Sequence, residues 1–182
     1  MRLIMLGGPG SGKGTQLQRL CSHLGLPGIS VGEILRKAIA SDNFLGKKAK
    51  PYVEKGELVP DELMIQLMRL RLLQADTQSG WIMEGYPRTA FQAEELDFVL
   101  ADFGQELDKA ILLQIDEAMM IERSKARSRR DDTLEIIKRR IELFKERTVP
   151  ILEYYEPREK LLRVNGNQTP DAVAADIRQQ LS

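Results

Sequence analysis

The sequence has few of the residues that build disulfide frameworks and metal centres. Its 182 residues include one cysteine, Cys21, and one histidine, His23. A single cysteine excludes an intrachain disulfide and favours a reducing compartment, so we expect a cytoplasmic protein. Cys21 falls in an apolar helical pattern, which predicts a packed, unreactive thiol. His23 has no cysteine or histidine cluster beside it and is expected at the surface.

An excess of one charge sign and long apolar runs are also absent. Lysine and arginine number 27, as do aspartate and glutamate, and the formal net charge is +0. No global field therefore attracts nucleic acid or an anionic membrane, and we expect neither as a partner. No basic start is followed by a long apolar run, and no run reaches the ~18 residues of a membrane helix, so we expect no signal peptide and no membrane span.

What the chain does contain is a regular alternation of short apolar runs and longer helical patterns. The expected strands are 3–6, 28–30, 80–84, 109–115 and 161–165. The expected helices are 13–24, 32–40, an interrupted 46–59, 60–75, 89–103, 117–125, 133–155 and a last one that starts at 169–171. This alternation predicts an α/β protein with a parallel sheet and helices on both of its faces.

A glycine loop lies between the first expected strand and the first expected helix. Residues 7–13 fit the pattern G-x-x-x-x-G-K, but Gly14 stands where the next position usually has a magnesium-binding hydroxyl, and Thr15 comes one residue late. Glycines let backbone N–H groups surround phosphate oxygens, and the helix start adds the positive end of its dipole. We therefore predict a nucleotide phosphate site at Gly10, Ser11, Gly12, Lys13, Gly14 and Thr15.

Several further motifs, in one order along nearly the whole chain, resemble those of adenylate kinases and related nucleoside monophosphate kinases. The motifs are GGPGSGKGTQ (7–16), ISVGEILR (29–36), GELVPDEL (56–63), MEGYPRTAFQAEEL (83–96), RSRRDDT (127–133) and RRIELFKERTVPILEYY (139–155). The resemblance implies a P-loop NTPase fold with a five-stranded parallel sheet, in a single domain of residues 1–182. It also implies a small helical acceptor-binding subdomain at 30–59, a very short lid at 126–132, and the reaction MgATP + AMP ⇌ two ADP.

The resemblance also suggests residues for the acceptor nucleotide. Arg36 and Arg88 match the two arginines that bind the acceptor phosphate, because guanidinium forks grip phosphate bidentately. Gln92 lies one helical turn after Arg88, and its amide both donates and accepts hydrogen bonds, as the adenine edge requires. The other residues that the resemblance places at the acceptor are Val31, Glu57, Leu58, Val59, Gly85, Tyr86, Pro87, Arg129 and Arg140.

Residues 122–140 hold the densest charge in the chain. A solvated helix face and a nucleic-acid site are the alternatives, but net neutrality and the lack of interleaved aromatics argue against nucleic acid. The resemblance places Arg127 and the backbone of Gln168 at ATP, and Asp131 and Asp132 at the start of the next helix. It makes these residues catalytic: Lys13, Arg88, Arg123, Arg129 and Arg140. The lid has no four-cysteine set, so we expect no zinc.

In the related kinases magnesium sits mostly on nucleotide oxygens and on waters held by acidic side chains, so Gly14 is normal there. Glu33 and Glu84 are the acids expected to hold such waters, and no direct protein ligand is expected. Glu84 departs from the usual aspartate, and a salt bridge at a strand end is its alternative role.

Val31 departs from the usual threonine, as the UMP/CMP kinases do, which keeps a pyrimidine monophosphate kinase as an alternative. A nucleotide-binding regulator with weak turnover is the other alternative, because both Val31 and Glu84 are atypical. The full set of cationic side chains favours the enzyme. From the resemblance we expect a monomer with a role in adenine nucleotide homeostasis.

Overall fold

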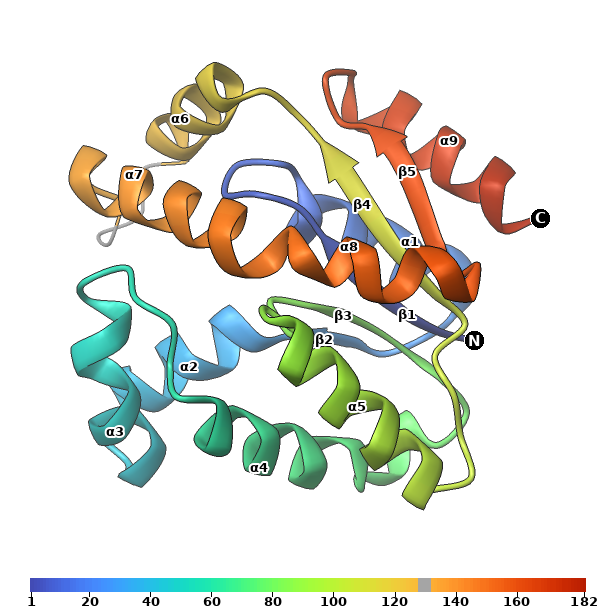
Figure 1. The fold of residues 1–182 in the computed structure, drawn as a ribbon, viewed down its shortest axis with the longest axis horizontal. Helices are drawn as coiled ribbons and strands as arrows, with labels where there is room; N and C mark the ends of the chain where they lie inside the picture. The colour runs from blue at the N-terminus through green and yellow to red at the C-terminus, as the bar shows by residue number, and fades with distance from the viewer. Residues whose placement is uncertain (128–131) are drawn as a thin grey trace.

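A central parallel sheet organises the chain in the computed structural model, which describes residues 1–127 and 132–182. Within these residues five strands pair in the order β2-β3-β1-β4-β5, and every pairing is parallel. The strands are β1 (Arg2–Leu6), β2 (Gly28–Ser30), β3 (Trp81–Glu84), β4 (Lys109–Gln114) and β5 (Leu161–Asn165). Helices cover both faces of the sheet (Figure 1), so the predicted fold class is confirmed.

The sheet is buried on both faces because its central strand, β1, carries apolar side chains on both faces. Leu3 and Met5 belong to one core cluster, and Ile4 and Leu6 to another, so the period-2 alternation of a strand divides them between the two faces. The first cluster contains side chains of α1 (Lys13–Leu24) and α9 (Pro170–Leu181). The second contains side chains of α2 (Val31–Ala40), α3 (Phe44–Val53), α4 (Asp61–Leu72), α5 (Ala90–Asp102) and α8 (Pro150–Tyr155).

Two helices flank the segment that the resemblance assigns to the lid. They are α6 (Glu117–Ala126) and α7 (Leu134–Leu143), which share a small apolar cluster of Met120, Ile137 and Ile141. The Thr133 side chain accepts a hydrogen bond from the N–H of Ile136 at 3.3 Å and so caps α7. Asp132, expected to start this helix, instead precedes its cap.

The helix expected at 133–155 is divided, which corrects that prediction. A π-helical turn at Phe144–Thr148 separates α7 from α8, and α8 begins at Pro150. Proline has no N–H to donate and its ring clashes with the carbonyl four residues earlier, so an undisturbed α-helix cannot pass through this position. The N–H of Val149 bonds instead to the carbonyl of Phe144 at 2.9 Å. The axis nevertheless continues, and α7 and α8 cross the molecule as one long segment (Figure 1).

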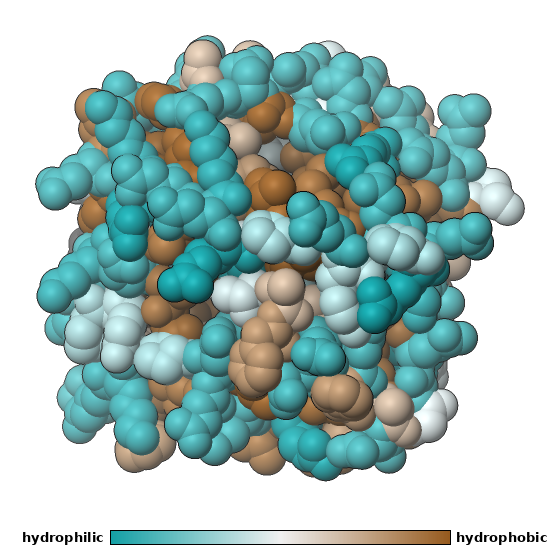
Figure 2. Space-filling model, in the orientation of Figure 1, coloured by the Kyte–Doolittle hydropathy of each residue, from teal (hydrophilic) through white to brown (hydrophobic). Residues whose placement is uncertain are grey.

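The surface is mainly polar. In the view of Figure 2 hydrophilic residues cover most of the face, and hydrophobic ones lie in recesses between them. Among residues 1–127 and 132–182, no helix has both the length and the apolar composition that crossing a membrane requires.

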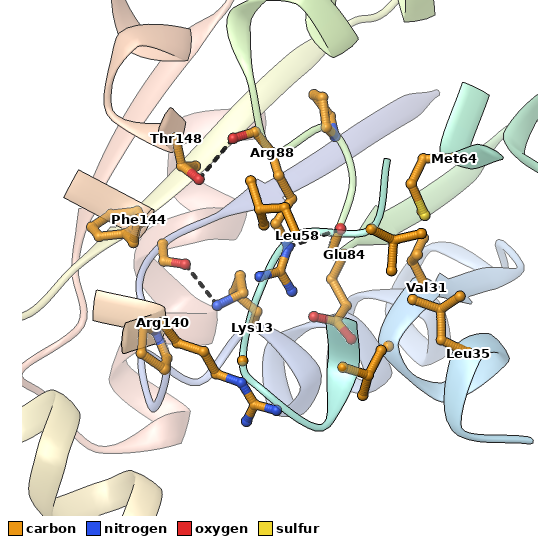
Figure 3. Close-up of a pocket in the computed structure, with 18 of the residues that line it drawn as sticks. Lys13, Val31, Leu35, Leu58, Met64, Glu84, Arg88, Arg140, Phe144 and Thr148 are labelled. Carbon is orange, nitrogen blue, oxygen red and sulfur yellow. Dashed lines mark hydrogen bonds between the residues drawn. The ribbon is translucent and has the colours of Figure 1, made fainter. Parts of the chain in front are cut away.

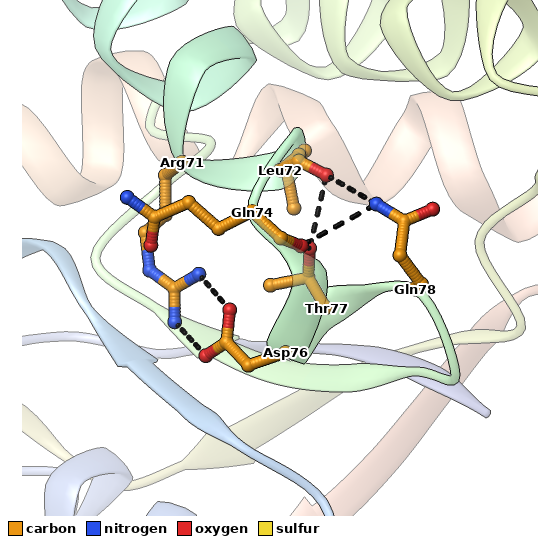
Figure 4. A network of polar contacts seen from close by, with 6 residues as sticks. All are labelled: Arg71, Leu72, Gln74, Asp76, Thr77 and Gln78. Atoms are coloured by element: carbon orange, nitrogen blue, oxygen red, sulfur yellow. Dashed lines mark hydrogen bonds and ion pairs between the residues drawn. The ribbon is translucent and has the colours of Figure 1, made fainter.

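A network of polar contacts lies at the end of α4, where the chain turns toward β3 (Figure 4). The buried hydroxyl of Thr77 lies 2.9 Å from the carbonyl oxygen of Leu72 and 2.8 Å from that of Gln74, which are acceptors at the helix end. Arg71 and Asp76 form a bidentate ion pair beside them, with distances of 2.9 and 2.7 Å. The Thr77 hydroxyl and the Gln78 amide thus reach carbonyl oxygens at the point where the helix ends and offers them no further intrahelical donors.

We expect Thr77→Val to lower the free energy of unfolding by about 1–3 kcal/mol, because a buried carbonyl loses its donor while the side-chain volume is unchanged. Urea unfolding followed by circular dichroism measures the difference. Thr77→Ser is the matched control, since it keeps the hydroxyl. If the valine variant is as stable as the serine variant, the network does not contribute to stability.

Candidate active site

The glycine loop connects β1 to α1, as predicted, and its backbone requires glycine at specific positions. Gly10 and Gly12 have φ values of 75° and 94°, which residues with side chains rarely adopt. A Cβ on Gly10 would also lie 2.8 Å from the carbonyl oxygen of Met120. The Lys13 ammonium donates to the carbonyl oxygens of Gly7 at 2.7 Å and Gly8 at 2.8 Å, which holds the positive charge over the loop.

Two cavities meet at the carboxyl ends of β1 and β3, the edge at which parallel sheets bind ligands. The loop cavity has a volume of about 920 Å³ and is lined by the glycine loop, including Gly14 and Thr15. The α2–α4 cavity has a volume of about 170 Å³ and lies between the sheet and the segment from α2 to α4. Both cavities are lined by Lys13, Arg36, Glu84 and Arg127, so these four side chains stand where the two spaces adjoin.

The α2–α4 cavity has an apolar end and a cationic end. Figure 3 shows the cationic groups of Lys13, Arg88 and Arg140 across the cavity from Val31 and Met64. Other lining residues at the apolar end are Leu35, Val53, Leu58 and Val59. A ligand with a flat apolar body and an anionic group fits this division, because each end meets the chemistry that it stabilises.

Arg88 lies in the turn after β3, where two hydrogen bonds to backbone carbonyl oxygens hold it in place. Its carbonyl oxygen accepts a hydrogen bond from the Thr148 hydroxyl at 2.9 Å, and its own Nε donates to the carbonyl oxygen of Gly85 at 3.1 Å. Its guanidinium projects into the cavity (Figure 3). Desolvation by the surrounding protein lowers the pKa of the Arg88 guanidinium. The negative charge of Glu84 opposes this shift, and the positive charge of Arg140 adds to it. The guanidinium still stays charged near neutral pH, since its ordinary pKa is far above it.

Asp132 joins two of the predicted site arginines. Its carboxylate, 1% exposed, accepts two hydrogen bonds of 3.0 Å from Arg127 and one of 2.9 Å from Arg140. Asp131 and Asp132 were predicted only to start a helix, so this role of Asp132 was not predicted from the sequence. The single signal in the sequence was the presence of two adjacent acids after an arginine-rich run. Arg129 and Asp131 lie outside the described residues.

The far wall of the loop cavity is formed by α6 and the loop after β5. Arg123 donates to the carbonyl oxygen of Gly166 at 2.9 Å, which ties this helix to the loop. The Gln168 side chain donates to Asp176 at 2.7 Å and to the carbonyl oxygen of Asn165 at 3.0 Å. Arg123, expected to be catalytic, and Gln168, expected at ATP, therefore line the same space as the glycine loop.

Two acids line the loop cavity and suit a magnesium ion bound through water. Glu33 and Glu84 both face this space, and the Ser30 hydroxyl donates a hydrogen bond to Glu84. Magnesium prefers oxygen ligands, keeps several waters and binds through one or two carboxylates plus substrate phosphates, so this donor set fits. Within residues 1–127 and 132–182, no group of three His, Cys, Asp or Glu side chains forms a metal site.

Glu57 makes an ion pair rather than pointing freely into the α2–α4 cavity. Arg139 of α7 donates to it at 2.7 and 3.2 Å, and this hydrogen bonding lowers the pKa of the Glu57 carboxyl. Gly56, beside it, packs against Ile136 of the same helix. The loop after α3 thereby contacts α7, and its residues Leu58 and Val59 line the cavity. Gly85 and Pro87 line it as well, while the side chain of Tyr86 is buried in the core.

The fold, the glycine loop and the two adjoining cavities are typical of a P-loop protein that binds nucleotide phosphates. Comparison with known proteins narrows this class. A family model described as adenylate kinase matches residues 5–160. The chain therefore belongs to the adenylate kinase family, as the sequence motifs predicted.

Individual relatives match over nearly their whole length. The chain is 60% identical over 177 residues to adenylate kinase 2 of Nostoc sp., covering 97% of this chain and 96% of that protein. It is 60% identical over 173 residues to adenylate kinase 2 of Synechocystis sp., covering 95% and 96%. It is 45% identical over 180 residues to adenylate kinase 1 of Nostoc sp., covering 99% and 98%.

We expect Asp132→Asn to lower kcat by about 10- to 150-fold, because hydrogen bonds to charged groups contribute about 1.5–3 kcal/mol each. The amide keeps one acceptor oxygen but turns an N–H₂ toward the guanidinium donors of Arg127 and Arg140. Steady-state rates with MgATP and AMP measure the change. Glu135→Gln, an exposed acid in the first turn of α7, is the matched control. Equal kcat in the two variants would mean that Asp132 does not position these arginines for the reaction.

Proposed function

We infer that this chain catalyses the reversible transfer of a phosphoryl group from MgATP to AMP, which produces two ADP. It is an enzyme of the kinase class, and membership of the adenylate kinase family supports this reaction. The observation that carries the assignment is the pair of cavities with Lys13, Arg36, Glu84 and Arg127 between them. One cavity offers a phosphate loop, the other an apolar end and a cationic end.

The reaction needs positioning and positive charge more than proton transfer. The acceptor atom is a phosphate oxygen that is already anionic near neutral pH, so no general base is required. The enzyme must align two polyanions and neutralise the charge on the transferring group. In this proposal Lys13 binds the outer phosphates of ATP from the glycine loop, and Arg36 and Arg88 bind the acceptor phosphate. Arg127 and Arg140, aligned by Asp132, approach the transferring group from the α7 side.

The remaining assignments follow the same division of the site. Arg123 would act as a catalytic residue at the far wall of the loop cavity, where Gln168 would contact ATP. Gln92 and Val31 would contact the acceptor base. Arg129 stays a proposed catalytic residue on the resemblance alone. Glu33 and Glu84 would hold waters of a magnesium ion, whose chemistry is to neutralise phosphate charge.

We also propose that residues 30–59 and 126–132 act as the acceptor-binding subdomain and the lid. Their closure would exclude water, which could otherwise accept the phosphoryl group. The single cysteine supports a cytoplasmic protein without a cysteine-bound zinc. The family resemblance supports a monomer that maintains adenine nucleotide levels.

We expect Lys13→Ala to lower kcat by about 10²–10³-fold while the fold is retained, by analogy with the loss of one donor to a developing charge. A coupled assay for ADP from ATP and AMP measures it, and circular dichroism tests the fold. Lys37→Ala, which removes an exposed lysine of α2, is the matched control. A folded Lys13→Ala protein with normal turnover would remove the glycine loop from the mechanism.

We expect AMP to be the preferred acceptor, and Val31→Thr to sharpen the preference for AMP over CMP and UMP by about tenfold at most. One hydrogen bond contributes about 0.5–1.5 kcal/mol, and 1.4 kcal/mol is one decade. Val31 is buried and lines the cavity, so an added hydroxyl would face the acceptor. The measurement is kcat/KM for the three nucleotides with MgATP. Preference of the unmodified protein for CMP or UMP would contradict the adenylate kinase assignment.

A further inference from the structure

Gln92 is held at every polar group that it possesses. Its N–H donates to the Thr89 hydroxyl at 3.1 Å, and its carbonyl oxygen accepts from the Tyr86 hydroxyl at 3.2 Å. Its side-chain Oε1 accepts from the N–H of Arg88 at 2.7 Å, and its Nε2 donates to Oδ1 of Asp61 at 2.7 Å. The residue is 1% exposed and nevertheless lines the α2–α4 cavity.

The two side-chain contacts allow one orientation of the amide. A backbone N–H can only donate, and an ionised carboxylate can only accept. If the amide were turned by half a rotation, its N–H₂ would meet the N–H of Arg88 and its oxygen would meet the carboxylate of Asp61. Both encounters are repulsive, so Arg88 and Asp61 together determine which end of the Gln92 amide is the donor.

An amide can donate two hydrogen bonds and accept two. Within the described residues, the protein contacts of the Gln92 side chain use one of each. One Nε2 hydrogen and one Oε1 lone pair therefore remain for a ligand in the cavity. The contacts with Arg88 and Asp61 determine which of these two groups, donor or acceptor, lies at which place on the cavity wall.

We propose that Asp61 is a positioning residue that makes this cavity select 6-amino purines over 6-oxo purines by holding the orientation of the Gln92 amide. Asp61 lies at the start of α4, behind Gln92 and outside the described lining of the cavity, so it acts through Gln92 and does not touch the acceptor. The proposal rests on the proposed function, in which Gln92 faces the acceptor base.

The two classes of purine present opposite patterns to such an amide. A 6-amino purine offers an N6–H donor and an N1 acceptor, whereas a 6-oxo purine offers an O6 acceptor and an N1–H donor. With the amide orientation held, a 6-amino purine forms two hydrogen bonds with Gln92. A 6-oxo purine instead places its O6 acceptor against Oε1 and its N1–H donor against Nε2. A site built to pair a polar edge strongly rejects the analogue that leaves buried groups unpaired.

Asp61 also carries a charge at a helix start, which stabilises any helix by its dipole. Glu62 is in the same first turn of α4, is exposed, and provides the same charge, whereas the Gln92 amide bonds to Asp61. Glu62→Ala therefore controls for the loss of an acid at this helix end. Asp61→Asn controls for geometry, because its Oδ1 can still accept from Gln92.

The experiment measures kcat and KM for AMP and for IMP, each with saturating MgATP. We expect Asp61→Ala to lower the AMP-to-IMP ratio of kcat/KM by about tenfold, the factor that corresponds to one hydrogen bond. The loss should appear as a higher KM for AMP with little change in kcat, the pattern of weakened binding. Asp61→Asn should restore most of the ratio, and Glu62→Ala should leave it unchanged.

A ratio in Asp61→Ala equal to that of Glu62→Ala would overturn the proposal, because only general helix stability would then be affected. If Asp61→Ala does not fold, Asp61→Ser serves, since serine suits a helix start and its shorter side chain leaves Nε2 of Gln92 unmet. Gln92→Ala separates this proposal from the proposed function. If Gln92→Ala keeps the AMP-to-IMP ratio of the unmodified protein, Gln92 does not contact the base and the proposed function of Gln92 is wrong. If the ratio falls in Gln92→Ala but not in Asp61→Ala, only the role of Asp61 is contradicted.

Discussion

The concentration of positive charge at one edge of the sheet is the constraint on which the rest of the site depends. Lys13, Arg36, Arg88, Arg127 and Arg140 line this pair of cavities, and like charges so close together repel one another. Hydrogen-bond acceptors from different parts of the protein offset this repulsion for several of them. Carbonyl oxygens of the glycine loop hold Lys13, and the buried carboxylate of Asp132, just before α7, holds Arg127 and Arg140. A polyanionic ligand then adds charge complementarity to a site that is already ordered.

The π-helical turn between α7 and α8 contributes to the same arrangement. It places Thr148 where its hydroxyl can hold the carbonyl oxygen of Arg88, and it places Phe144 in the wall of the cavity. Figure 3 shows both side chains beside Arg88 and Arg140. The irregular turn, which Pro150 requires for backbone reasons, therefore lies next to the functional surface, as π-turns often do.

Most of the fold was predictable from local patterns. The strands were found because short apolar runs ended in glycine or polar residues, and the glycine loop was found because its torsions and its lysine leave a recognisable spacing. Helix ends were less predictable. The helix expected at 133–155 was divided by a proline that a periodicity argument passes over, and Asp132 was expected in a helix that Thr133 in fact caps. Within the site, the motifs identified the residues that line the cavities, but not the residues behind them.

By itself, the sequence determined the class of the protein, since the glycine loop, the arginines and Gln92 depend on residue type and short spacing. Only the tertiary structure decided the partners of these residues. Asp61 meets Gln92 across 31 positions, Thr148 meets Arg88 across 60, and Arg139 meets Glu57 across 82. Such contacts form because helices from separate parts of the chain pack on one sheet, and no local pattern encodes which side chains then face each other. The physical reason is that a hydrogen bond depends on distance and direction in space, whereas a motif records only order along the chain.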